Sequence, residues 1–232
     1  VAKSKPDGYT LLLANANHTV NPALRKSLPY DPIKDFTPIC RIANQTVVLM
    51  VHPSVPARTV PEFIQLAKAR PGQLAFASPG VGTASHMTGV LFQAMTKINL
   101  LFVPYKGAGP SLIDLIAGQV TVGASGLTSS VQYIDSGRLR ALGVTTATRS
   151  KLKPQIPTIA ESGVPGFEVT NWFGILAPAG TPAAVIDRIQ EQLSRILQYP
   201  TNEQLIFKLG LEPPPMASGE FVETPLMQRG GV

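Results

Sequence analysis

Short apolar runs recur along the chain, separated by turns that contain glycine and proline. Within each run the apolar residues are consecutive rather than alternating, which is typical of strands buried on both faces of a sheet. Segments with helical periodicity lie between many of them. This order predicts an α/β fold of mostly parallel sheets flanked by helices. The predicted strands cover residues 9–14, 47–51, 74–78, 100–105, 120–125, 139–146 and 173–178.

Helix signals fall between these runs. Thr59 and Glu62 have the spacing of a capping box and predict a helix that stops near residue 70. Ser111 is the expected cap of the helix before Gly118, and Pro182 opens the longest one. The helix after residue 84 has spacings of three and four, so we expect its buried stripe to be Met87, Val90, Leu91 and Met95.

Composition narrows the possible functions. The chain has 232 residues, of which 44% are hydrophobic and 15% charged, with a formal net charge of +6. The basic residues are dispersed and only 6% of residues are aromatic, which argues against a nucleic-acid groove. Cys40 is the single cysteine and has no metal-ligand spacing around it, so no metal and no cofactor are expected. No apolar run reaches membrane-span length.

The stretch SPGVGTASH, residues 78–86, joins a predicted strand to a predicted helix without any charged side chain except the weak base His86. Backbone N–H groups at a helix start are unpaired and lie at the positive end of the macrodipole, so they can bind an anion. The loop at residues 78–86 therefore predicts a site for a small carboxylate or phosphate. The candidate ligand-binding residues of this loop are Ser78, Gly80, Val81, Gly82, Thr83, Ser85 and His86. Residues 105–110 form a second turn of the same kind.

Other interpretations of this loop fit less well. A dinucleotide fingerprint would have glycine where Ser85 stands, and a Walker loop would end in Gly-Lys-Ser/Thr. Ser85 and His86 are adjacent on a helix, so their side chains diverge and do not form a nucleophile–base pair. No catalytic residue is assigned. An α/β enzyme acting on an anionic metabolite, or a ligand sensor, remain alternative functions.

Several motifs, in fixed order, resemble one known family over residues 2 to about 220. They include PDGYTLLL (6–13), LPYDPIKDFTPI (28–39), FASPGVGTASHMTG (76–89) and VPYKGAGPSLIDLIAGQV (103–120). The chain resembles the Bug-type extracytoplasmic solute receptors, the substrate-binding proteins of bacterial tripartite tricarboxylate transporters. The resemblance implies a two-lobed, hinged periplasmic binding protein of type II. Its ligand would be a di- or tricarboxylate, or an acidic or aromatic acid.

The resemblance also implies an organisation and partners. Lobe I would combine residues 1–51 and 173–232, and lobe II would be residues 52–172. Asn15, Asn17 and His18 match a crevice loop of the first lobe, and Ser125 falls in the crevice of the second. The protein would be a periplasmic monomer that delivers its ligand to the membrane subunits of a transporter.

Two departures from the family pattern affect the first lobe. Relatives begin with a signal peptide, a strand, a loop, a helix and a second strand, whereas this sequence opens on VAKSKPDGYT. The segment FVETPLMQRGGV at the other end lacks an expected amphipathic helix. We therefore expect an incomplete first lobe, an exposed sheet edge and weakened ligand binding.

Overall fold

The computed structural model describes residues 1–25, 27–208 and 210–213. The chain divides into two compact units: unit 1 contains residues 1–44 and the segment from residue 171 onward, and unit 2 contains residues 45–170. The C-terminal segment FVETPLMQRGGV lies outside the described residues. None of the helices in the described part of the chain has the length and apolar character that a membrane span requires.

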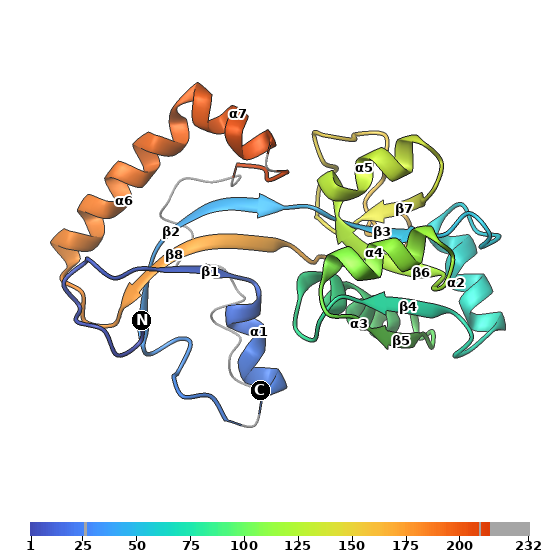
Figure 1. The fold of residues 1–232 in the computed structure, drawn as a ribbon, viewed down its shortest axis with the longest axis horizontal. Helices are drawn as coiled ribbons and strands as arrows, with labels where there is room; N and C mark the ends of the chain where they lie inside the picture. Colours follow the sequence, from blue (N-terminus) through green and yellow to red (C-terminus); the bar gives the residue numbers. More distant parts are fainter. Residues whose placement is uncertain (26, 209, 214–232) are drawn as a thin grey trace. The chain divides into compact units, whose positions relative to one another are not determined.

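Unit 2 is built on a five-stranded sheet of order β5-β4-β6-β3-β7 (Figure 1). Strand β4 is parallel to both β5 and β6, whereas β3 is antiparallel to both β6 and β7. The sheet is therefore mixed rather than mostly parallel, and the α/β class itself is confirmed. The strands are β3 (Val47–Val51), β4 (Ala75–Ser78), β5 (Leu101–Pro104), β6 (Val122–Gly126) and β7 (Arg140–Val144).

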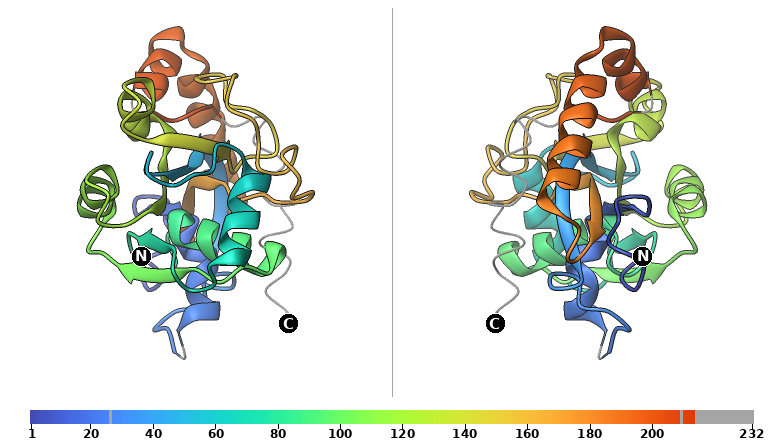
Figure 2. Two further views of the ribbon diagram at one scale, coloured as in Figure 1. Left: turned by 90° about the vertical axis from the view of Figure 1, so that its right-hand side faces the viewer. Right: turned by 90° about the vertical axis from the view of Figure 1, so that its left-hand side faces the viewer.

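The consecutive apolar run of β3 reflects burial on both faces of this sheet. Val47, Leu49 and Val51 join one core cluster, which includes side chains of α2 (Val60–Ala69) and α3 (Ala84–Thr96). Val48 and Met50 join the other cluster. That second cluster includes side chains of α4 (Ala108–Ile116) and α5 (Leu127–Asp135), so helices cover both faces (Figures 1 and 2).

Two of the predicted helix starts have different outcomes. Helix α2 has its predicted cap, since the Thr59 hydroxyl accepts the Glu62 N–H at 3.3 Å. The Glu62 carboxylate accepts the Arg58 N–H at 2.7 Å, one residue before the N–H that a capping box uses. Helix α4 begins at Ala108, earlier than the predicted cap at Ser111. Gly107 (φ 114°) precedes it, and Ser111 lies inside the helix with its hydroxyl donating to the Ala108 carbonyl.

The predicted buried stripe of α3 is wrong in most positions, although Leu91 packs against the core. Its buried residues are Ala84, Thr88, Gly89, Phe92 and Thr96, while Met95 is 38% exposed. The close approach at Gly89 explains this, because a Cβ atom there would lie 2.7 Å from Cζ of Phe76 on β4. A face of small residues lets the helix lie directly on an aromatic side chain of the sheet, and apolar spacing alone does not register that.

The boundary of unit 2 precedes β3, whereas the sequence placed it after residue 51. The reason is that β3 is the strand between β6 and β7, and its pairing partners all belong to unit 2. Buried Thr145 ties the segments near both ends of this unit together. Its N–H donates to the Val47 carbonyl at 2.9 Å, and its hydroxyl donates to the Val169 carbonyl at 2.6 Å.

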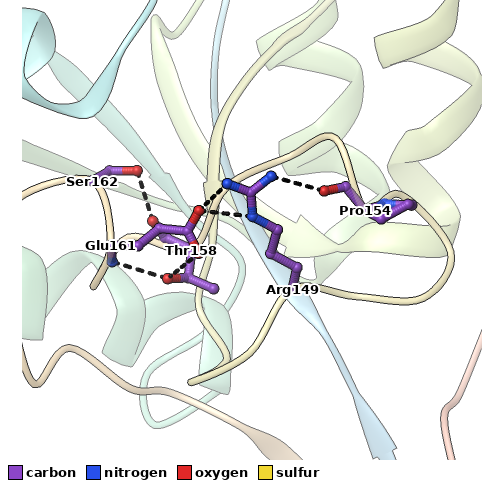
Figure 3. Close-up of polar contacts among 5 residues, drawn as sticks. All are labelled: Arg149, Pro154, Thr158, Glu161 and Ser162. Carbon is purple, nitrogen blue, oxygen red and sulfur yellow. Dashed lines mark hydrogen bonds and ion pairs between the residues drawn. The ribbon is translucent and has the colours of Figure 1, made fainter.

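The segment from Thr145 to Thr170 carries a polar cluster centred on Arg149 (Figure 3). The Arg149 guanidinium forms an ion pair with Glu161 and donates to the Pro154 carbonyl at 3.0 Å. Thr158 completes the cluster, since its hydroxyl accepts the Glu161 N–H at 3.0 Å. Ile159, Val164 and Phe167 of the same segment are buried in the core. The polar cluster therefore adds hydrogen bonds at the surface of a segment whose apolar side chains pack inside.

Glu161 is expected to make stability depend on pH. The hydrogen bond from Arg149 holds the pKa of this carboxyl below its ordinary value. A lowered folded-state pKa stabilises the protein above the unfolded-state pKa, and this contribution disappears as pH falls through the folded-state pKa. Glu161→Gln should therefore unfold at lower urea than wild type at neutral pH, and the difference should shrink as the pH falls below the ordinary glutamate pKa of about 4.3. Glu168→Gln, which removes an exposed carboxylate bonded to Thr170 instead, is the control and should unfold at nearly the same urea concentration as wild type at neutral pH.

The described residues of unit 1 form a three-stranded sheet of order β1-β8-β2, with β1 antiparallel to β8. One face packs on α6 through Ile186, Ile189 and Leu193, and the other holds an aromatic cluster that includes Phe36 and Trp172. Strand β2 and helices α1 and α7 were absent from the prediction. The elements are β1 (Leu12–Asn15), α1 (Asn17–Leu24), β2 (Phe36–Gln45), β8 (Asn171–Pro178), α6 (Ala183–Gln198) and α7 (Pro200–Lys208).

Candidate functional site

Three helix N-termini meet at one edge of the sheet of unit 2. Because β5, β4 and β6 are parallel, their carboxyl ends lie at the same edge. Each strand leads there into the helix that follows it: β4 into α3, β5 into α4 and β6 into α5. Neighbouring strands are about 4.8 Å apart, so the three starts are close together. Their macrodipoles place partial positive charge at this edge.

The first turns of these three helices contain no acidic residue. Helix α2 provides the comparison within the same unit, because it carries Glu62 in its first turn. That helix follows β3, which is antiparallel to β6, so it begins at the opposite edge of the sheet. The positive ends of the helices are thus left without an acidic side chain at the edge formed by β5, β4 and β6. Lys106, exposed between β5 and α4, adds a positive charge there.

The loop between β4 and α3 is shaped by Thr83. Its hydroxyl donates to the Gly80 carbonyl at 2.8 Å and accepts the His86 N–H at 3.2 Å, which caps α3. The single hydroxyl proton is therefore committed inside the loop, and Thr83 shapes the turn instead of donating to a carboxylate. Gly82 (φ 83°) adopts the left-handed conformation that this turn requires. The sequence assigned Thr83 to direct ligand contact, and in this structure its hydroxyl proton is directed to Gly80.

Several donors of the loop remain available to an anion. Ala84 and Ser85 occupy the first two positions of α3, where an N–H has no carbonyl partner within the helix. Ser85 is half-buried and Ser78, at the end of β4, is 4% exposed. Val81 forms the exposed tip of the turn. These positions give a set of neutral donors suited to one carboxylate.

The second glycine turn supports the first. The Tyr105 N–H donates to the Ser78 carbonyl at 2.8 Å, and the Gly107 N–H donates to the Pro79 carbonyl at 2.9 Å. The Tyr105 hydroxyl donates to the Asp114 carboxylate at 2.8 Å, which fixes this turn on α4. The backbone of the candidate anion loop is therefore held in place by its neighbour along the edge of the sheet.

Ser125 lies on the third strand that ends at this edge. It is 5% exposed, and its hydroxyl oxygen is 3.4 Å from that of Ser129. Ser129 donates its own proton to the Gly126 carbonyl at 2.8 Å, so the proton of Ser125 is the one left to direct toward Ser129 or a ligand. The start of α5 was not recognised from the sequence. Its signal was Gly126 followed by a serine- and threonine-rich turn directly after an apolar run.

The candidate residues of unit 1 surround a separate cavity. Asn15, Asn17 and His18 all line a cavity of about 570 Å³, together with Lys3 and Tyr30. The Asn15 side-chain oxygen accepts the Asn17 N–H at 3.0 Å at the start of α1, so the amide NH₂ of Asn15 is its remaining donor.

His18 has a structural role in this unit. It is 7% exposed, its ring stacks on Tyr30, and Phe36 meets it edge-on. Its Nε2 lies 2.9 Å from the Pro32 carbonyl, which requires a proton on that nitrogen. Burial lowers the pKa of His18, so the ring is neutral near pH 7. These contacts account for His18 as a packing residue that fixes residues 30–36.

Groups suited to metal binding are not assembled in the described ranges. Within residues 1–25, 27–208 and 210–213, no three side chains of histidine, cysteine, aspartate or glutamate come together as metal ligands would. Cys40 is buried, and burial raises the pKa of its thiol to about 11. The thiol is therefore protonated at neutral pH and acts as a small apolar side chain.

Curated relatives match most of this chain but extend beyond it. A protein encoded between tcbD and tcbE in Pseudomonas sp. strain P51 is 37% identical over 213 residues. Protein BugT of Bordetella pertussis is 36% identical over 199 residues. The matches cover 91% and 85% of this chain, and 63% and 61% of the respective relatives. The chain thus spans less than two thirds of the length of these relatives.

Solved structures show the same fold. The structure of R. palustris Rpa4515 with adipate is 34% identical, with a TM-score of 0.84 over 98% of this chain and 76% of that chain. MatC (Rpa3494) from Rhodopseudomonas palustris with bound malate is 30% identical, with a TM-score of 0.82 over 98% of this chain and 78% of that chain. The family model described as the tripartite tricarboxylate transporter family receptor matches residues 1–224. The chain therefore belongs to this receptor family, to which the Bug-type proteins that it resembles in sequence are related, and it has their α/β fold.

Proposed function

We propose that this chain is a non-enzymatic receptor for a small carboxylate. The observation that carries the proposal is the meeting of three helix N-termini, none with an acid in its first turn, at one edge of the sheet of unit 2. Neutral donors at such an edge stabilise an anion without a charged side chain. Ser78, Ser85, Ser125 and the amides of Val81, Ala84 and Ser85 are the proposed contacts.

The relatives support the class of ligand. Adipate and malate, named with two structures that share this fold, are both dicarboxylates. We infer that the first carboxylate is bound at this edge of unit 2. In unit 1, Asn15 and Asn17 line a cavity and stay candidate ligand contacts. The receptor would act in the periplasm as a monomer and deliver its ligand to the membrane subunits of a tripartite transporter.

A thermal-melt panel tests this proposal. The chain would be melted with adipate, malate, citrate and nicotinate, and with the neutral diamides of adipate and malate as controls. A ligand at a hundred times its dissociation constant adds about 2.7 kcal/mol, a shift of roughly 5–10 °C for a chain of this size. We expect at least one acid to shift the melt and its diamide to have no effect. The panel is also run on a protein extended to the length of the relatives, and no shift by any acid in either protein would reject a carboxylate receptor.

A further inference from the structure

His86 contacts the loop that precedes its own helix. It is the third residue of α3, and the Gly82 N–H points to its ring nitrogen Nδ1 at 3.4 Å. The ring of Phe102 on β5 meets the imidazole in a T-shaped arrangement with 5.7 Å between ring centres. A nitrogen that accepts an N–H cannot carry a proton, so in this arrangement the neutral imidazole holds its proton on Nε2.

This contact adds a further hydrogen bond to those with which Thr83 holds the loop. Thr83 already links Gly80 to His86 through its hydroxyl, and the Thr83 N–H donates to the Gly80 carbonyl at 3.2 Å. Gly82 lies between Gly80 and Thr83 and has a positive φ, a conformation that glycine adopts easily. The bond from its N–H to Nδ1 fixes the orientation of this peptide group. This peptide group is next to the one that carries the Val81 N–H, so the bond to Nδ1 restrains that amide and the turn that leads into Ala84.

We propose that His86 is a positioning residue for the carboxylate site, acting through its unprotonated Nδ1 on the Gly82 amide instead of contacting the ligand. The proposal rests on the proposed function, because it assigns a role within the same loop. It also separates two functions that the sequence assigned together. Gly82, Thr83 and His86 hold the loop, and the amides at the start of α3 bind the anion.

Protonation of His86 should release this contact. An imidazolium has an N–H at both ring nitrogens, so Nδ1 would no longer accept from Gly82. Burial lowers the pKa of His86, so the ring is neutral at pH 7 and charges only in more acidic solution. The other titratable groups of the elements beside the loop are Tyr105, Lys106 and Asp114, and Asp114 is bonded to Tyr105. Together with His86 these are the titratable groups around the loop, and His86 is the histidine of this set.

Two amide variants of His86 distinguish the positioning role of Nδ1 from an effect of side-chain size. In His86→Asn the side-chain oxygen takes the place of Nδ1 and keeps an acceptor for Gly82, whereas in His86→Gln the amide is placed one bond farther out, near the position of Nε2. We expect His86→Asn to bind malate or adipate as wild type does at about pH 7.5, and His86→Gln to bind roughly three- to tenfold more weakly. Amide exchange at Gly82 should be slow in wild type and His86→Asn, and faster in His86→Gln.

The pH profile gives the second measurement. Between about pH 7.5 and about pH 5.5 the affinity of wild type should decline relative to that of His86→Asn at each pH, a comparison that cancels titration of the ligand. Affinity that rises on acidification in wild type alone would show a charged His86 attracting the ligand and would overturn the proposal. Equal affinity of the Asn and Gln variants would overturn it as well. If wild type binds neither acid, the affinities are measured with whichever acid shifts its melt, and the exchange rates at Gly82 test the contact without any ligand.

Discussion

Ser85→Asp is expected to abolish carboxylate binding while leaving the fold at least as stable as wild type. Ser85 is the second residue of α3, where an N–H has no carbonyl partner within the helix. An aspartate in the first turn interacts favourably with the macrodipole and stabilises the helix by about 0.3–1 kcal/mol. The same carboxylate would occupy the amides proposed to bind the ligand and would repel its charge. Like charges in contact cost several kcal/mol, so affinity should fall by roughly a hundredfold or more.

Ser85→Asn is the matched control for this experiment. It has nearly the size of aspartate without the charge, so it should bind within roughly tenfold of wild type, since it replaces one hydroxyl donor by an amide. Affinity would be measured by calorimetric titration with malate or adipate, and stability by thermal melts without ligand. If Ser85→Asp and Ser85→Asn weakened binding equally, the charge of the site would not be decisive, and the assignment of an anion to the start of α3 would be wrong.

Phe76→Ala is expected to give the largest loss of stability, about 3–5 kcal/mol. Phe76 is fully buried on β4, two residues before Ser78, and its ring lies 5.1 Å from that of Phe102 between ring centres. It also fills the space beneath Gly89 of α3. Truncation would remove the apolar contacts on both sides and leave a cavity directly below the helix that carries the anion loop. Urea unfolding should report the loss, and Phe207→Ala, at a side chain that is 37% exposed, should cost far less.

A double mutant tests the packing account itself. Gly89→Ala alone should destabilise by about 1–3 kcal/mol, because its new Cβ atom would overlap the Phe76 ring. In Phe76→Ala/Gly89→Ala the same methyl group enters the space that the ring has vacated. The double mutant should therefore be more stable than the sum of the single effects implies. Strict additivity would show that the two positions do not share this space.

The local turn chemistry was readable in advance where it depends on neighbours in sequence. The Thr59–Glu62 cap, the strand at 47–51 and the loop at 78–86 all follow from short-range rules, and the structure has each of them. Strand β2 was missed because Pro38 and Arg41 interrupt its apolar run. The buried stripe of α3 was misread because glycine and threonine can face a core when a helix lies close to a sheet.

The position of the candidate site was easier to predict from the sequence than the roles of its individual residues. The pattern of a strand, a glycine turn and a helix identifies the anion loop, since unpaired N–H groups are a property of every helix start. Which donors stay free depends on bonds that form only once the loop is folded. Thr83 commits its proton to Gly80, and His18 lies in an aromatic cluster against Pro32, although both residues look like ligand contacts in the sequence.

The sequence by itself determined the α/β class and the glycine turn at residues 78–86, because apolar runs, caps and turn residues act over a few neighbouring positions. The family was indicated by the resemblance of motifs in a fixed order. Tertiary structure alone decided that β3 belongs to unit 2 and runs antiparallel to β6, since strand pairing joins residues far apart in the chain. It also decided that α3, α4 and α5 begin at one edge while α2 begins at the other. Strand direction sets which helix dipoles add together, and direction is a property of the folded sheet.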